Sequence, residues 1–354
     1  MAAEKNNDVG RRQLSGGGSM RRVLMVSGLL AVLSLGGIAQ IPLKFTLDWA
    51  YQGPQAPFLV ALYKGYFAAE GLEVTIDRGY GSADAVTKIA TGVYDIGFAD
   101  INSMIEFNVR NPDRALIAVA IVYDYAPFSI VTLRGRGIEK PQDLVGRTLG
   151  APAGDASRRL FPVFAKVTGI DPTAVNWVTM EAALRERLLV LGQVDAISAH
   201  FFTALINLKA MGVPEADIVV LLYAEHGLDL YGNAVMCSPK LLQEKPEAVR
   251  AFLRALTRAW HDTLANPAEA VAFVKQRDPL IDPAVELERL LLAINVCMLT
   301  PDVRERGFGD ARPERLARAI ALVAEGFGLP YVPRVEEVFT PAYLPPLAER
   351  LPRK

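Results

Sequence analysis

The stretch LDWAYQGPQAPFLVALYKGYF, Leu47–Phe67, is the most informative part of the chain, together with the turn Glu70-Gly71 and the alternating Leu72–Ile76. It predicts a strand that ends in a polar and aromatic loop, followed by a helix and a second strand. The loop therefore lies at the carboxyl end of the first strand, the edge at which α/β sheets hold ligands. We expect binding residues in this loop at Asp48, Trp49, Tyr51 and Gln55.

Strand and helix patterns alternate in two sets along the chain. The expected strands cover residues 43–47, 72–76, 95–98 and 115–122 in the first set, and 148–150, 175–178, 195–197 and 218–221 in the second. After Gly232 the pattern changes to helices that begin near prolines, at 246–264, 267–276, 283–299 and 313–324. Such alternation predicts an α/β fold of mostly parallel sheets flanked by helices.

The composition is that of a globular protein. With 354 residues, 51% of them hydrophobic, the chain is long enough for two lobes. A net charge of -1 argues against nucleic acid as a partner. The two cysteines, Cys237 and Cys297, have no metal-ligand spacing, and whether they pair is open. We expect no metal and no cofactor.

The N-terminal region has the pattern of an export signal. Met20-Arg21-Arg22 precedes the apolar run Val23–Leu35, which is too short to span a bilayer. Gly37 and Ala39 supply the small side chains of a cleavage site before Gln40. We expect residues 1–39 to be a signal peptide with an N-terminal extension, and the mature protein to be periplasmic. The pair Arg11-Arg12 leaves twin-arginine export open beside the general route, and the true start codon is open too.

The order of these motifs resembles the solute-binding proteins of the taurine, nitrate and thiamine-pyrimidine-precursor importers. The likeness begins with LDW and KGYF in residues 47–67 and continues to the C-terminal tail through the motifs at 81–85, 91–97, 144–150, 169–172, 192–196, 244–256 and 339–344. The resemblance implies a type II periplasmic-binding-protein fold with two lobes. It assigns residues 40–127 and 232–354 to lobe 1 and residues 128–231 to lobe 2. A two-segment hinge near 126–128 and 230–232 would let the lobes close on a ligand.

Aromatic and acidic side chains in the first loop suit a planar ligand. Trp49 and Tyr51 can stack on such a ligand and still use their N–H and O–H groups. Packing of Trp49 in the core is the alternative. Asp48 either accepts hydrogen bonds from a ligand amine or only caps the following turn.

Two glycine-containing turns precede helices, one expected in each lobe. They contain Gly81 and Ser82 in the first case, and Gly154, Asp155 and Ser157 in the second. Free backbone N–H groups at helix N-termini suit a carboxylate, sulfonate or phosphate, although such caps are common without any ligand. Arg158 adds positive charge, which Asp155 opposes.

Further polar and aromatic residues follow the ends of other expected strands or lie at the hinge crossings. These are Asn102, Tyr123, Trp177, Tyr231 and Asn233. Tyr231 and Asn233 either touch the ligand or only satisfy the backbone of the hinge. Together with the loop and turn residues, they complete the candidate binding site.

The resemblance implies a periplasmic substrate-binding protein of an ABC importer. It would capture a small planar or anionic solute, such as a pyrimidine-type thiamine precursor, an aromatic acid or a sulfonate. We expect a monomer that delivers the ligand to permease and ATPase subunits and performs no bond chemistry, so no catalytic residue is assigned.

The alternative is a pyrimidine synthase of thiamine biosynthesis, which shares the fold and the opening motif. In an ungapped alignment on Trp49 and residues 64–67, Gln55 occupies the position of the essential histidine of those synthases. Their cysteine-rich run is absent as well, and only Cys237 lies near its position. A third possibility is a ligand-sensing protein without transport.

Overall fold

The computed structural model describes residues 40–353, which belong to one compact unit. The expected signal peptide and its cleavage site fall on residues 1–39 and lie outside the described residues. Among the helices of residues 40–353, none combines the length and apolar character needed to cross a membrane.

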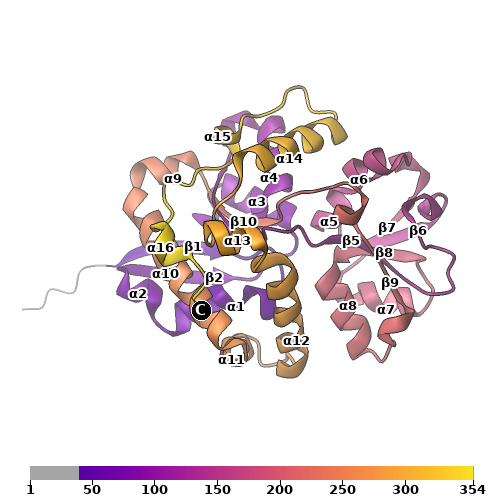
Figure 1. Ribbon diagram of the computed structural model, residues 1–354, viewed down its shortest axis with the longest axis horizontal. Helices are drawn as coiled ribbons and strands as arrows, with labels where there is room; N and C mark the ends of the chain where they lie inside the picture. The colour runs from indigo at the N-terminus through magenta and orange to yellow at the C-terminus, as the bar shows by residue number, and fades with distance from the viewer. Residues whose placement is uncertain (1–39, 354) are drawn as a thin grey trace, which may run out of the picture. The chain divides into compact units, whose positions relative to one another are not determined.

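The first sheet contains four parallel strands and one antiparallel strand. They are β1 (Ile41–Thr46), β2 (Leu72–Asp77), β3 (Ile96–Asp100), β4 (Ile117–Ile121) and β10 (Asn233–Cys237). Their order across the sheet is β2-β1-β3-β10-β4, and β10 runs antiparallel to both of its neighbours. We call the part of the molecule around this sheet lobe 1 (Figure 1).

The second sheet repeats this arrangement. It contains β5 (Phe128–Leu133), β6 (Thr148–Ala151), β7 (Asn176–Thr179), β8 (Ala196–His200) and β9 (Ile218–Leu222), in the order β7-β6-β8-β5-β9. Here β5 is the antiparallel strand, paired with β8 and β9. We call the part around this sheet lobe 2. The expected α/β class with mostly parallel sheets is therefore confirmed.

Two strands are absent from the sequence-based expectation, β5 and β10. Both are buried along nearly their whole length, so neither shows the polar and apolar alternation that marks a half-buried strand. Our expectation that the pattern after Gly232 is only helical was wrong, because residues 233–237 form β10. Each of these strands enters its sheet directly after the chain has crossed from the other sheet.

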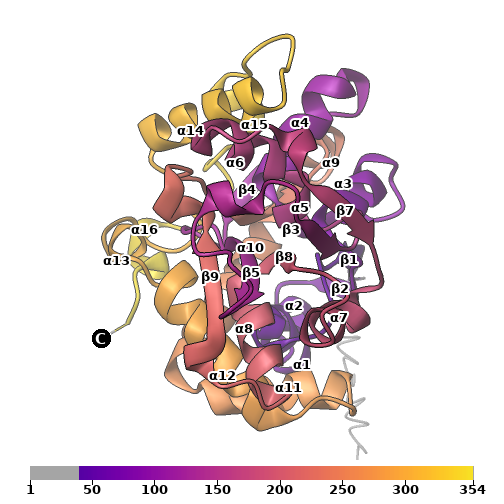
Figure 2. The same cartoon turned by 90° about the vertical axis from the view of Figure 1, so that its right-hand side faces the viewer.

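Helices cover both sheets. In lobe 1 they are α1 (Ala56–Tyr63), α2 (Tyr66–Ala69), α3 (Ser82–Ala90) and α4 (Ile101–Arg110), and in lobe 2 they are α5 (Ala156–Arg159), α6 (Phe161–Thr168), α7 (Arg185–Val190) and α8 (Phe201–Ala210). The C-terminal helices are α9 (Pro239–Glu244), α10 (Pro246–Ala265), α11 (Pro267–Arg277), α12 (Pro283–Ala293), α13 (Pro301–Arg306), α14 (Pro313–Gly326), α15 (Val335–Val338) and α16 (Leu347–Arg350). A π-helical segment, Ile294–Met298, continues α12. Figure 2 looks onto lobe 2 and shows α8 beside α12.

An aromatic cluster joins α1 and α10 to the first sheet. The rings of Phe45 and Phe252 stack with centroids 5.3 Å apart, and Phe58 lies 4.9 Å from Phe45. Stacked and tilted rings of this kind stabilise a core beyond their buried area. The cluster fixes α1 against β1, and so it fixes the loop between them.

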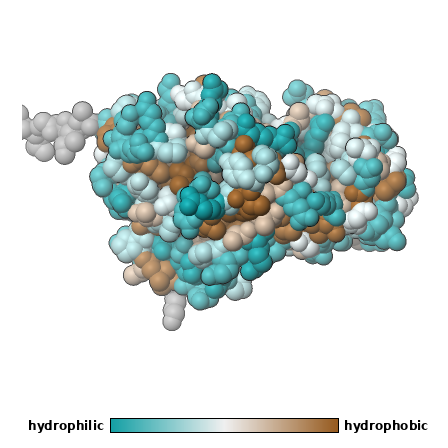
Figure 3. Space-filling view, turned by 90° about the horizontal axis from the view of Figure 1, so that it is seen from above, coloured by the Kyte–Doolittle hydropathy of each residue, from teal (hydrophilic) through white to brown (hydrophobic). Residues whose placement is uncertain are grey.

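The surface is mixed in polarity. Seen from above (Figure 3), hydrophobic residues form small patches among hydrophilic ones. This face therefore shows no continuous apolar surface of the kind that marks a large partner interface.

Candidate functional site

A narrow cavity lies where the strand ends of the two lobes face each other. Its volume is about 20 Å³. Residues of both lobes line it: Asp48, Trp49, Gln52, Gln55, Gly81 and Ser82 from lobe 1, and Asp155, Ala156, Arg185, His200, Phe202 and Thr203 from lobe 2. The lobes are thus described in a closed arrangement with room for little more than a water molecule.

Asp48 lies at the lobe 1 wall, directly after β1. Its carboxylate accepts hydrogen bonds from Gln55 Nε2 at 3.0 Å and from Asn233 Nδ2 at 2.8 Å. Burial raises the pKa of Asp48 to about 6, although these two bonds oppose the shift. A buried carboxylate supported only by neutral amides is well placed to accept a further hydrogen bond from a ligand.

Unpartnered acceptors surround this carboxylate. Gln55 Oε1 and Asn233 Oδ1 are buried and have no hydrogen-bond partner among the described residues. Since a buried polar atom without a partner destabilises the folded state, a ligand that donates N–H or O–H groups would relieve that cost. The lobe 1 wall therefore offers two acceptors to the cavity, the Asp48 carboxylate and Gln55 Oε1, while Asn233 lies behind the wall.

Trp49 is half-buried and faces lobe 2. The guanidinium carbon of Arg185 lies 5.5 Å from its ring centroid, within the range of a cation–π contact. Trp49 belongs to the cavity wall rather than to the core of the first sheet.

Arg185 is the centre of a buried charge network in lobe 2. Its Nε and NH2 donate to Glu186 Oε1, and its NH1 donates to Asp155 Oδ2 at 3.3 Å and to the Ser198 carbonyl oxygen at 3.1 Å. Burial raises the pKa of Asp155, with Arg185 opposing the shift. Four of the five N–H groups of this guanidinium already have protein partners, so the arginine has one N–H, on NH2, left for an anionic ligand.

His200 contributes a neutral imidazole to the lobe 2 wall. Burial, with the positive charge of Arg185 adding to it, lowers the pKa of His200 to about 3. At neutral pH the ring therefore carries one N–H donor and one acceptor nitrogen. The rings of Phe128, Phe202 and Tyr123 pack around it.

At each of the two helix N-termini that we expected to bind an anion, one backbone N–H is hydrogen-bonded to a protein group. Ala83 N–H of α3 faces the Gly154 carbonyl oxygen at 3.5 Å. The Asp155 side chain caps α5 by accepting from Arg158 N at 2.9 Å. Gly81, Ser82 and Asp155 do line the cavity, while Gly154 contacts Gly81. In this arrangement a backbone carbonyl oxygen and a carboxylate lie at the two helix N-termini, where they would repel an anion.

Three predicted residues of lobe 1 lie away from the cavity wall. Tyr51 donates its hydroxyl to the Ile76 carbonyl oxygen and packs against Arg277. Asn102 lies in the first turn of α4, where its Nδ2 donates to Asp100 and to the Tyr231 carbonyl oxygen. Tyr123 is fully buried, and its hydroxyl has no partner among the described residues.

The predicted residues of lobe 2 outside the cavity are engaged with protein groups. Ser157 donates its hydroxyl to the Ala199 carbonyl oxygen. Arg158 donates to the Ala151 carbonyl oxygen and to Thr179, with its guanidinium 4.9 Å from the Trp177 ring centroid. The Trp177 ring also packs edge-on against Phe161. These residues support the second sheet rather than line the cavity.

The two predicted residues at the second crossing, Tyr231 and Asn233, also form hydrogen bonds with other protein groups. The Tyr231 hydroxyl accepts from Arg312 N. Asn233 positions Asp48 from behind through its Nδ2, so it acts on the cavity without lining it.

Several cavity residues are absent from our sequence-based site. The residues not assigned are Gln52, Ala156, Arg185, His200, Phe202 and Thr203. Gln52 and Ala156 are neighbours of assigned positions, and Phe202 and Thr203 follow β8 at its carboxyl end. That edge gives a usable signal for all four. Arg185 had no such signal, because it begins a helix and reaches the cavity by the length of its side chain.

Two hydroxyl groups line the cavity, and both are hydrogen-bonded to protein groups. Ser82 Oγ accepts from Asp100 N, and Thr203 Oγ1 donates to Gln52 Oε1 at 3.3 Å. Neither hydroxyl is paired with a base in the way that nucleophilic catalysis requires. In the part of the chain that the structure describes, no group of three or more His, Cys, Asp or Glu side chains is arranged to hold a metal ion.

Comparison with known sequences gives matches of more than one kind. A family profile described as NMT1/THI5 like matches residues 53–270. The riboflavin-binding protein RibY of Chloroflexus aurantiacus is 28% identical over 217 residues, which cover 61% of this chain and 60% of RibY. The formylaminopyrimidine-binding protein of Halalkalibacterium halodurans is 26% identical over 262 residues, 71% of this chain and 78% of that protein.

An enzyme is also among the relatives. The 4-amino-5-hydroxymethyl-2-methylpyrimidine phosphate synthase of Legionella pneumophila is 23% identical over 239 residues, 66% of this chain and 72% of the synthase. Among solved structures, the alkanesulfonate-binding protein SsuA of Xanthomonas axonopodis pv. citri, bound to MOPS, superposes with a TM-score of 0.64 at 17% identity. That likeness covers 85% of this chain and 98% of SsuA, and it confirms the periplasmic-binding-protein fold.

Proposed function

Because this chain belongs to the NMT1/THI5-like family, we propose that it is the exported substrate-binding component of an ABC importer, working as a monomer in the periplasm. Its lobes would divide at residues 127/128 and 231/232, and the two crossings would form the hinge. Solved structures with this fold include ligand-binding components of ABC importers. The cavity between the lobes is where such a protein captures its ligand.

We propose that the ligand is a small planar heterocycle that donates hydrogen bonds, in the class of the pyrimidine-type thiamine precursors. The observation that supports this choice is the buried carboxylate of Asp48 beside the unpartnered Gln55 Oε1. Aminopyrimidine N–H groups match such acceptors, and Trp49 offers an aromatic face for the ring.

An aromatic acid or a sulfonate suits this cavity less well. The arginine nearest the cavity is neutralised by Asp155 and Glu186, and Asp48 would repel a second negative charge nearby. At the helix N-termini that would compensate, the Gly154 carbonyl oxygen and the Asp155 carboxylate each accept one N–H. An anionic ligand therefore ranks below a ligand that donates hydrogen bonds.

A binding panel tests this proposal. Mature protein would be titrated calorimetrically with formylaminopyrimidine, riboflavin, an aromatic carboxylate and MOPS, and whatever co-purifies from the native host would be extracted under denaturing conditions for mass spectrometry. We expect the pyrimidine to bind and MOPS not to bind. Tight binding of MOPS without binding of either heterocycle would overturn the ligand class.

The synthase relatives make an enzyme the competing function. We propose that this chain is not an enzyme. In the ungapped alignment on Trp49 and residues 64–67, Gln55 takes the place of the essential histidine, and its Nε2 donates to Asp48. The resemblance to the pyrimidine synthases implies a single-turnover enzyme that uses its own side chain as a reactant, and such an enzyme would lose mass. Intact-protein mass spectrometry after incubation with cell extract should therefore show an unchanged mass, and a mass loss located at the cavity would favour the enzyme.

A further inference from the structure

Helix α12 holds the loop that supplies Gln52 and Gln55 to the cavity. Gly53 N donates to Glu286 Oε2 at 2.7 Å, in a buried position. The loop packs so closely on the helix that a Cβ on Gly53 would lie 2.2 Å from the Glu286 carbonyl oxygen. The carboxylate of Glu286 is in turn paired with Arg289, whose Nε and NH2 donate to its two oxygens at 3.0 and 3.1 Å.

The same arginine crosses to lobe 2. Arg289 NH1 donates to the Thr203 carbonyl oxygen at 3.1 Å, and NH2 donates to Asn207 Oδ1 at 2.9 Å. Both acceptors belong to α8, which lies beside α12 in Figures 1 and 2. Thr203 also lines the cavity and is hydrogen-bonded to Gln52. A buried guanidinium therefore joins the ligand loop of one lobe to the cavity helix of the other.

We propose that the Glu286–Arg289 pair is a closure clamp, a pair of positioning residues that favours the closed arrangement whichever ligand binds. Opening the lobes would remove Thr203 and Asn207 from a charged donor, and charge-assisted bonds are the strongest hydrogen bonds in proteins. Only interactions that differ between the open and closed states shift their populations, and these two bonds differ because they cross between the lobes. The proposal rests on the lobe closure assumed in the proposed function, but not on the identity of the ligand.

The chain offers a matched control on the same two helices. Lys209 of α8 and Glu288 of α12 also form an ion pair between the lobes, but their side chains are 29% and 50% exposed, against 2% and 6% for Arg289 and Glu286. Exposed pairs contribute little because water and salt screen them. Breaking the exposed pair should therefore leave the balance between open and closed states nearly unchanged.

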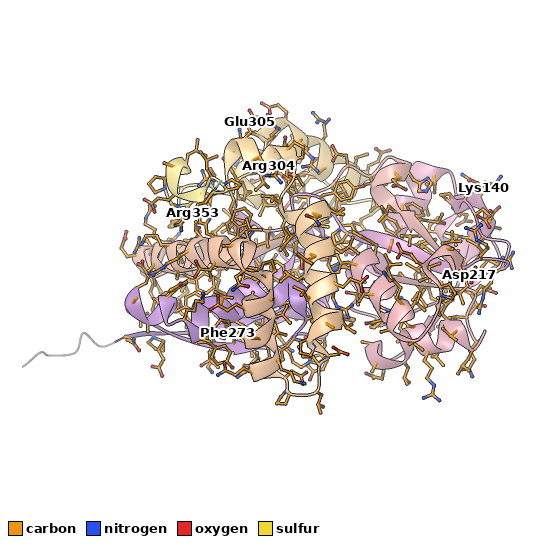
Figure 4. The ribbon with its side chains drawn as sticks, turned by 60° about the horizontal axis from the view of Figure 1, so that its bottom comes forward. Lys140, Asp217, Phe273, Arg304, Glu305 and Arg353 are labelled. Atoms are coloured by element: carbon orange, nitrogen blue, oxygen red, sulfur yellow. The ribbon has the colours of Figure 1, made fainter. Side chains whose placement is uncertain are left out.

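The test measures closure directly in ligand-free protein. Spin labels would be attached at Lys140→Cys and Arg304→Cys, two exposed positions in different lobes (Figure 4). The native Cys237 and Cys297 are buried, so they should not react. Distance distributions would be recorded for the labelled parent and for the same protein carrying Asn207→Ala, Asn207→Asp or Glu288→Gln.

We expect Asn207→Ala to raise the ratio of the open to the closed population by about tenfold, since it removes one bond to a charged group. Asn207→Asp keeps an acceptor oxygen and should retain the closed population, and Glu288→Gln should match the parent. Thermal unfolding of Asn207→Ala should stay close to that of the parent. Equal distributions for Asn207→Ala and the parent, or an equal shift with Glu288→Gln, would overturn the clamp while leaving the ligand panel unaffected.

Discussion

Gly81 of lobe 1 lies directly against Gly154 of lobe 2. A Cβ built on Gly81 would be 2.4 Å from the Gly154 carbonyl oxygen and 2.6 Å from its carbonyl carbon, both backbone atoms. Gly81 also has a φ of 125°, which side chains rarely permit. Closure of the lobes at this point therefore depends on the absence of a side chain.

Replacing Gly81 by Ala should hold the lobes apart. The added methyl group cannot fit against the Gly154 backbone, so we expect a larger radius of gyration in small-angle scattering with ligand present, and a loss of affinity of about tenfold or more. Gly92→Ala is the control, because Gly92 has a φ of 75° but open space around its Cβ. It should lose stability without changing the radius. Ligand-induced compaction of the Gly81 variant equal to that of the parent would contradict this prediction.

Trp49 should contribute directly to ligand affinity. We expect Trp49→Ala to cost about 2–4 kcal/mol of binding, with Trp49→Phe recovering part of the loss, because an aromatic contact and its buried area disappear. Since Arg185 covers one face of the ring, the ligand would stack on the other face or replace that contact. Calorimetric titration and thermal unfolding together separate binding from packing. A large drop in melting temperature with unchanged affinity would make Trp49 a core residue.

Asp48 should link stability to pH in the direction opposite to a salt-bridged carboxylate. Its folded-state pKa is about 6, above the ordinary value of 3.8. The contribution of Asp48 to the stability of the fold is therefore complete at pH values below the ordinary pKa, and it is lost as pH rises through the folded-state pKa. A difference of this size between the two pKa values corresponds to about 3 kcal/mol. Asp48→Asn should therefore raise the free energy of unfolding at neutral pH, and this gain should vanish near the ordinary pKa. Urea unfolding at neutral pH and at a pH near the ordinary pKa of 3.8 checks this prediction. An equal gain in the free energy of unfolding at the two pH values would refute the burial argument.

The same titration should govern binding. A ligand that donates to the ionised carboxylate should bind less tightly as pH falls below the Asp48 pKa of about 6, and Asp48→Asn should bind weakly at every pH. Calorimetric titrations on both sides of that pKa test this. An affinity that increases on acidification would indicate that the ligand instead accepts a proton from Asp48.

The N-terminus of the mature protein should be at or close to Gln40. Gly37 and Ala39 have the small side chains that signal peptidase accepts. N-terminal sequencing of protein from the native host checks the prediction. Retention of residues 20–35 in a cytoplasmic form would exclude the export proposal.

The sequence was most informative where side chains follow the ends of parallel strands. Asp48, Trp49 and Gln55 follow β1 and reach the cavity, because the edge of a parallel sheet brings such loops together. Strands β5 and β10 were missed since complete burial removes the alternation that identifies a strand.

Polar residues near a strand end were harder to assign. Asn102 and Ser157 have suitable side chains, but backbone carbonyls of neighbouring segments bind them. Arg185 was missed because its role depends on where α7 lies in space. The sequence shows the hydrogen-bonding capacity of a residue, whereas only the packed structure shows which group uses it.

The position of β10 imposes an order on folding. In the first sheet β10 lies between β3 and β4, so β4 has no neighbouring strand in that sheet until residues 233–237 have been synthesised. The strands of the second sheet, residues 128–222, all emerge before then. Lobe 2 can therefore assemble its sheet from continuous chain while lobe 1 is still incomplete. A chain cut before residue 233 would therefore leave β4 at an edge with no neighbouring strand, although residues 117–121 that form it are present.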